Sequence, residues 1–170
     1  EKLLKIAKAA APLGIEMLVM DDGWFGVRND ESASIGDWVV NEKKLPGGLS
    51  ALTKELNKLG MKFGLWFEPE IVSFNSDLYR AHPDWCLHVD GYDRSVGRET
   101  AVLDFTRKEV VDHVFNMVSN VLRSADISYV KWDFNRNLTE VGSDALPSDQ
   151  QKEVFHRYVL GVYDLAERLT

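Results

Sequence analysis

The alternation of short apolar runs with amphipathic stretches is the feature that most constrains the fold of this chain. The apolar runs, which predict strands, are 15–20, 62–67 and 127–132. The amphipathic stretches, which have helical periodicity, are 1–12, 49–59, 108–122 and 149–169. Helices and strands that alternate in this order predict an α/β fold with parallel strands joined by right-handed crossovers.

Carboxylate residues follow all three predicted strands, at Asp21-Asp22, Glu68 with Glu70, and Asp133. Acids at the carboxyl ends of several parallel strands are how a (β/α)8 barrel builds an active site. An open doubly wound sheet also binds ligands there. However, no Gly-rich phosphate loop follows any of these strands, which disfavours nucleotide binding.

The predicted strands are too few for a complete barrel, which needs eight strands and typically ~250 residues. Three strands alone would leave sheet edges bare. We therefore expect the 170 residues to supply roughly the first half of a (β/α)8 TIM barrel, from helix 1 through helix 4. The remaining segments predict a Gly-rich loop over 26–48 and a longer loop over 73–100. A short helix near 77–81 and an extended piece at 102–105 are also expected.

Composition excludes several classes of protein. The chain has 20 Lys and Arg against 27 Asp and Glu, a net charge of −7, so nucleic acid is not an expected partner. No run is long and apolar enough to predict a membrane span. The single cysteine, Cys86, excludes an internal disulfide framework. An opening that predicts a helix rather than a signal peptide suggests a piece of a larger protein, and these properties are compatible with a bacterial cytoplasmic enzyme.

The segment Lys131-Trp132-Asp133-Phe134-Asn135 carries the clearest chemistry. Side chains alternate along a strand, so Lys131, Asp133 and Asn135 are expected on one face. A neighbouring cation keeps a carboxylate ionised, as a nucleophile or a cation-stabilising group requires. The alternatives are that Asp133 is a cap or turn residue, and that Lys131 forms a purely structural ion pair with it.

Other polar groups at the strand ends allow more than one interpretation. Asp21 and Asp22 suit hydrogen bonds from sugar hydroxyls, although one of them could cap the next segment. Trp66 is by default a core residue, but at a strand end it could stack on a sugar ring. Glu68 and Glu70 are equally compatible with catalysis and with bracing loops through Arg pairs.

The sequence predicts no metal or cofactor site. No His lies at ligand spacing from the Asp21-Asp22 pair, and His82, His88, His113 and His156 are scattered along the chain. We interpret these four histidines as structural or surface residues.

Three motifs at the strand ends closely resemble the α-galactosidases of glycoside hydrolase family 36. Two shorter motifs between the first and second of them resemble the same family, and the resemblance covers essentially the whole chain in order. The motifs are Met20–Gly26, Gly36–Trp38, Leu45–Leu49, Gly64–Glu70 and Lys131–Arg136.

The resemblance implies a role for seven residues. It makes Asp133 the catalytic nucleophile of the fourth barrel strand and Lys131 a contact of the galactose ring hydroxyls. Asp21 and Asp22 would grip the hydroxyls that distinguish galactose, including the axial 4-OH. The resemblance also makes Trp66 an aromatic wall, Arg98 a loop arginine near the sugar, and Asn135 a neighbour of the nucleophile.

The family comparison implies that parts of the enzyme are missing from this chain. Strand 1, strands 5–8, the flanking β domains and the acid/base aspartate of the sixth strand are expected elsewhere, so the fragment alone is expected to be inactive. The chain also has Glu99-Thr100 after Arg98, where related sequences often carry Gln. This difference affects the expected contacts of the Arg98 loop and not the expected reaction.

The resemblance implies a retaining α-galactosidase that needs no metal or cofactor, acts on melibiose and raffinose-type oligosaccharides, and is often a homo-oligomer. Besides this sugar substrate, the expected partner is the remainder of the parent barrel. The alternatives are a related galactosyltransferase of the raffinose-synthase type and an inactive carbohydrate-binding fragment.

Overall fold

The computed structural model describes residues 1–94, 97–139 and 141–170. Its main sheet consists of three parallel strands in the order β1-β2-β5, with β1 at Met17–Met20, β2 at Lys62–Phe67 and β5 at Tyr129–Trp132. The register pairs Met20 with Leu65 and Phe67 with Trp132. The predicted parallel α/β arrangement is therefore confirmed, whereas its closure into a barrel stays a prediction.

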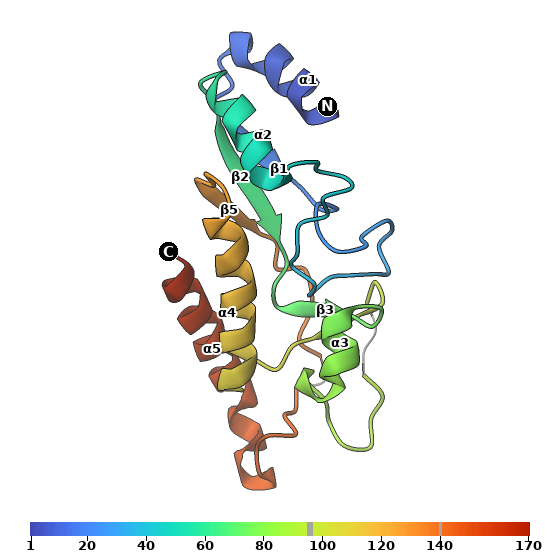
Figure 1. Cartoon of the computed structure of the whole chain (residues 1–170). Coiled ribbons are helices and arrows are strands. Elements are labelled where there is room, and N and C mark those ends of the chain that lie inside the picture. Colours follow the sequence, from blue (N-terminus) through green and yellow to red (C-terminus); the bar gives the residue numbers. More distant parts are fainter. Residues whose placement is uncertain (95–96, 140) are drawn as a thin grey trace.

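Helices connect the strands as the periodicity predicts (Figure 1). Their bounds are Lys2–Ala10 for α1, Gly48–Asn57 for α2, Asp77–Ala81 for α3, Lys108–Arg123 for α4 and Val154–Leu169 for α5. Short 3-10 segments occupy Ala11–Leu13, Pro83–Trp85 and Ser148–Glu153. Within the described ranges, no helix is both long and apolar enough to cross a bilayer.

A second, two-stranded sheet was not predicted. It pairs β3, Ile71–Ser73, with β4, Thr100–Val102, in antiparallel register. Figure 1 shows β3 and α3 beyond the carboxyl end of β2. Of these six residues, Ser73 and Thr100 were expected in the loop over 73–100, whereas Val102 was expected to be extended. Three-residue strands are too short to show a periodicity. The strand predicted to begin at residue 127 also begins two residues later than expected.

Aromatic side chains form the core beneath the carboxyl ends of β1 and β2. Trp24, Phe25, Trp38, Trp66 and Phe67 are all nearly or fully buried, with neighbouring ring centroids 4.6–6.2 Å apart. The Trp24 indole nitrogen also donates to the Trp66 carbonyl at 3.0 Å. The loop after β1 is thus fixed to the end of β2 by packing, although it contains no regular helix or strand.

The last helix lies unusually close to the segment that follows β4. An added Cβ on Gly161 of α5 would lie only 2.0 Å from the Phe105 carbonyl oxygen, so only glycine permits this approach. Tyr158, one turn earlier, stacks on the Phe105 ring at 5.6 Å. In Figure 1, α5 runs beside α4. This packing brings the buried Tyr158 hydroxyl towards the end of the sheet.

Candidate active site

The parallel sheet gathers the predicted polar residues at one edge. The carboxyl ends of parallel strands point the same way, so residues that follow β1, β2 and β5 become neighbours. Asp133 follows β5, and its backbone N–H donates to the Phe67 carbonyl at the end of β2. Groups more than sixty residues apart in the sequence are thereby brought within hydrogen-bonding reach.

Asp133 is held as a carboxylate by its neighbours. Its Oδ2 accepts a hydrogen bond from the Trp66 indole nitrogen at 3.1 Å and lies 3.5 Å from the Lys131 ammonium. The Trp66 hydrogen bond lowers the pKa of Asp133 most, and the Asn135 side chain and the Lys131 charge lower it further. The side chain is 38% exposed, so an ionised oxygen remains accessible to a ligand.

Lys131 bridges two carboxylates. Its Nζ lies 3.0 Å from Asp21 Oδ2, in addition to its contact with Asp133. The hydrogen bond with Asp21 is the main cause of a raised pKa for Lys131. The pKa of Asp21 is lowered, first by the backbone N–H of Asp22 and then by Lys131. These contacts form an ion pair that is open to solvent, which is compatible with either a structural role or a substrate-binding role.

Asp22 has a different partner, which the sequence analysis missed. The buried Arg28 guanidinium grips both carboxylate oxygens, with Nε at 3.0 and 3.1 Å and Nη2 at 2.7 Å. Arg28 also donates from Nη1 to the Ala33 carbonyl at 3.0 Å. A paired guanidinium fork fixes both the position and the plane of a carboxylate. No periodic signal marks Arg28, because it lies in an irregular loop.

Trp66 is more deeply buried than a sugar-stacking residue needs to be. Only 3% of its surface is exposed, and its ring lies parallel to that of Phe25 at 6.2 Å. Its observed link to the site is the hydrogen bond from Nε1 to Asp133. Stacking of Trp66 on a sugar ring stays a prediction.

Glu68 lies beneath the exposed part of the site. It is 1% exposed, and neither carboxylate oxygen makes a hydrogen bond of good geometry with the described residues. Burial raises the pKa of Glu68, while the Asn135 side chain and the Arg98 charge oppose this effect. Asn135 therefore faces both Asp133 and Glu68. Arg98 acts on Glu68, and its contact with a sugar stays a prediction.

The turn that carries Arg98 is strained. Arg98 and Glu99 have φ values of 55° and 53°, in the left-handed region that costs non-glycine residues roughly 1–2 kcal/mol each. Next to them, an added Cβ on Gly97 would lie 1.9 Å from the Arg136 guanidinium. Gly97 thus lets the segment after Asp133 pack against the Arg98 turn. Strain of this kind often accompanies functional loops.

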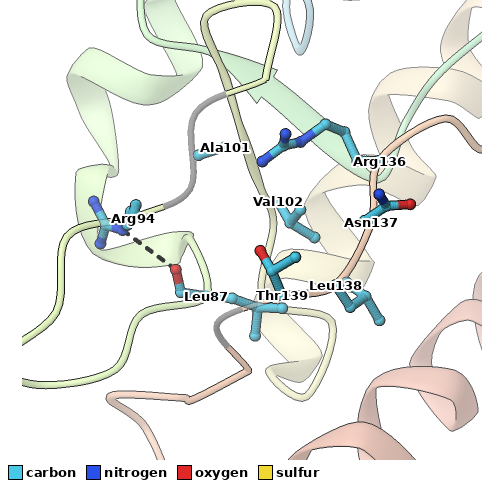
Figure 2. Close-up of a pocket in the computed structure, with 8 residues that line it drawn as sticks. All are labelled: Leu87, Arg94, Ala101, Val102, Arg136, Asn137, Leu138 and Thr139. Carbon is cyan, nitrogen blue, oxygen red and sulfur yellow. Dashed lines mark hydrogen bonds between the residues drawn. The ribbon is translucent and has the colours of Figure 1, made fainter.

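A separate pocket lies between β4 and the segment that follows Asn135, and Figure 2 shows the eight side chains that line it. Arg94 enters from the 92–94 loop, where its Nε donates to the Leu87 carbonyl at 3.3 Å. None of the seven predicted site residues lines this pocket. The predicted chemistry therefore lies at the end of the main sheet and not in this cavity.

The described residues contain one group with the composition of a metal site. His88, Asp90 and Asp144 have donor atoms within 4.8 Å of one another, and both carboxylates are exposed. The group lies on two loops and includes none of the predicted site residues. A structural or surface role was expected for His88.

Comparison with known proteins places the whole chain in one group. A family model described as Melibiase matches residues 1–170. Alpha-galactosidase AgaA of Geobacillus stearothermophilus is 57% identical over the full chain, and Alpha-galactosidase Mel36A of Lactobacillus acidophilus is 48% identical over 99% of it. The chain spans 23% of the length of each of these relatives.

Solved structures that resemble this chain are also α-galactosidases. The crystal structure of the glycoside hydrolase family 36 α-galactosidase AgaB from Geobacillus stearothermophilus matches all of this chain, and 24% of its own, with a TM-score of 0.97 at 58% identity. A variant of AgaA from the same organism, solved in complex with raffinose, matches 99% of this chain and 24% of its own with a TM-score of 0.96 at 56% identity.

Proposed function

Since this chain belongs to the Melibiase family, glycoside hydrolase family 36, we propose that it is part of the catalytic domain of an α-galactosidase. The proposed substrates are oligosaccharides with a terminal α-linked galactose, such as melibiose and raffinose. The observation that carries the proposal is Asp133, a partly exposed carboxylate held ionised at a strand end by Trp66 and Lys131. Closure of the sheet into a (β/α)8 barrel by strands outside these 170 residues belongs to the same proposal.

The proposed mechanism is a double displacement with retention of configuration. A carboxylate oxygen of Asp133 attacks the anomeric carbon as its bond to the leaving oxygen breaks, and a general acid protonates that oxygen. The product is a β-galactosyl ester of Asp133. Water, deprotonated by the same acid/base residue, then attacks the anomeric carbon and releases galactose in the α configuration.

Electrostatics support Asp133 as the nucleophile rather than the acid. Its lowered pKa means that it is ionised at neutral pH, as the attacking group must be. The general acid must instead hold a proton, and two carboxyl groups ~5–5.5 Å apart are expected in a retaining enzyme. Asp21 is paired with Lys131 and Asp22 with Arg28. We therefore propose that the acid/base residue comes from outside these 170 residues.

The remaining predicted residues have binding roles in this proposal. Asp21 and Asp22 would accept hydrogen bonds from galactose hydroxyls, and Lys131 would donate to them. Asn135 and Arg98 would contact the sugar from the loops beside Asp133. Trp66 would orient the nucleophile through its indole N–H and form an aromatic wall beside the sugar.

Mechanism-based trapping tests the proposal directly. The complete enzyme would be treated with an activated fluorinated α-galactosyl donor, and the labelled peptide would be identified by mass spectrometry. We expect a galactosyl label on Asp133, because its carboxylate forms the covalent bond. An active enzyme that is labelled at Glu68, Glu70 or Asp22 instead would show that the assignment of the nucleophile is wrong.

The 170 residues alone are expected to hydrolyse melibiose negligibly. Without a general acid the leaving oxygen would depart as an alkoxide, and general acid catalysis typically contributes about 10²–10⁴-fold. Galactose release by the purified 170-residue fragment can be compared with release by the complete enzyme. Clear turnover of melibiose by the fragment would place the acid among these residues, with Glu68 as the first candidate because its pKa is raised.

A further inference from the structure

Glu70 is a fully buried acid that the proposed mechanism does not use. It follows Pro69 after β2, with 0% of its surface exposed. Its Oε2 accepts a hydrogen bond from the Trp132 indole nitrogen at 2.8 Å, and Oε1 has no hydrogen-bond partner among the described residues. A buried carboxyl group is costly to maintain unless its contacts compensate.

The Trp132 contact connects Glu70 to the nucleophile. Trp132 is the last residue of β5, so it immediately precedes Asp133 and points to the opposite face of the strand. Glu70 is itself fixed, because its carbonyl accepts from the Leu103 backbone N–H at 2.9 Å. A displacement of the Trp132 ring would therefore be transmitted to the backbone that carries Asp133.

The titratable groups near Glu70 come from its own segment and from α5. Glu68 lies two residues away, and Tyr158 approaches from α5 with a buried hydroxyl that has no partner among the described residues. Asp104, which follows β4, in turn acts on Tyr158. Burial, reinforced by the charge of Glu68, raises the pKa of Glu70 to about 8. The carboxyl group therefore favours its protonated, uncharged form at neutral pH.

We propose that Glu70 is a positioning residue for Asp133, which it holds in place by anchoring the Trp132 indole. This inference rests on the proposed function, because it assumes that Asp133 is the nucleophile. Glu70 does not touch the substrate, and its effect passes through Trp132. Small displacements of a reacting group can cost about 10²-fold in rate.

The raised pKa of Glu70 predicts how the stability of the folded chain depends on pH. Between the ordinary pKa near 4.5 and about 8, the unfolded chain loses the Glu70 proton while the folded chain keeps it. The stability contributed by the neutral carboxyl is therefore complete below pH 4.5 and lost as the pH rises to about 8. Above pH 8 a buried charge would lie near Glu68, so we expect the melting temperature of the enzyme to fall as the pH rises towards 8.

The experiment compares E70L with E70Q in the complete enzyme. E70L removes the acceptor for Trp132, and we expect kcat at pH 7 to fall about 10–100-fold with KM changed much less. The rate at which the fluorinated donor labels Asp133 should fall in parallel. E70Q keeps a neutral acceptor of the same shape, so it should restore most of the lost activity, and the melting temperature should fall less between pH 5 and pH 8 than in the unmodified enzyme.

Two further variants keep the test decisive. W132F breaks the same hydrogen bond from the other side, so it should reproduce the kcat loss even if E70L fails to fold, and the two effects should not be additive. E167Q, at an exposed position of α5, is the matched control and should alter neither kcat nor the pH dependence of the melting temperature.

Different results would overturn different claims. If E70L and W132F are folded and label Asp133 at the normal rate, Glu70 has no positioning role. An E70Q variant that is as slow as E70L would equally reject it. If the unmodified enzyme is not labelled at Asp133, the proposed function itself fails, whatever the Glu70 variants do.

Discussion

Replacement of Asp133 by asparagine in the complete enzyme is expected to lower kcat by at least about 10³-fold. Asparagine has nearly the same shape and can still accept from the Trp66 indole, so the fold and KM should change little. However, an amide oxygen is a much weaker nucleophile than a carboxylate and does not form the galactosyl ester. Steady-state hydrolysis of an aryl α-galactoside would measure the loss.

Two controls separate lost chemistry from lost structure. D149N changes an exposed aspartate outside the site and should leave kcat unaltered. In D133G, added azide can occupy the space of the missing carboxylate and attack the anomeric carbon from the same side, which would yield β-galactosyl azide. A D133N enzyme within tenfold of normal activity, or a D133G enzyme that gives only the α-azide, would contradict the assignment.

Replacement of Arg28 by methionine is also expected to have a large effect. Methionine fills the buried space but removes the guanidinium fork that fixes Asp22. Hydrogen bonds to charged groups contribute about 1.5–3 kcal/mol, so a misplaced Asp22 should lower kcat/KM about 10–100-fold. Galactose binding should weaken by a similar factor, measurable by titration calorimetry.

Two control variants accompany R28M: one keeps the positive charge at residue 28, and the other removes an arginine outside the site. R28K keeps the charge without the fork and should recover only part of the loss. R107M removes another largely buried arginine, paired with Asp84 and Glu109 outside the site, so it should lower the melting temperature without weakening galactose binding. If R28M is folded and binds galactose normally, Asp22 does not depend on Arg28 for its function.

Much of the local structure could be predicted from periodicity. The helix expected at 108–122 is α4, and the strand expected at 62–67 is β2. These elements follow from apolar residues repeating at intervals that only one secondary structure can bury. The first turn of the helix expected at 149–169 is instead a 3-10 segment, Ser148–Glu153, before α5 begins. Helix ends depend on local hydrogen bonds that periodicity does not describe.

Some contacts of the candidate site could also be predicted from the sequence, and others could not. Lys131 and Asp133 share a strand face, and the parallel order of β1 and β5 relative to β2 brings Asp21 to them, so this cluster could be predicted. Arg28 and the contact between Glu70 and Trp132 could not. Arg28 reaches Asp22 only because an irregular loop folds back, and Glu70 meets Trp132 across 62 residues of chain.

The sequence by itself determined the α/β alternation, the position of carboxylates at the strand ends and the family to which the chain belongs, since each is encoded by the order of residue types along the chain. The tertiary structure alone decided which partner each carboxylate has and whether it is exposed. Asp133 and Glu70 are both carboxyl groups beside a tryptophan, yet the first is partly exposed near a cation and the second is buried near an acid. The pKa of Asp133 is therefore lowered and that of Glu70 raised, because desolvation and neighbouring charge depend on three-dimensional surroundings.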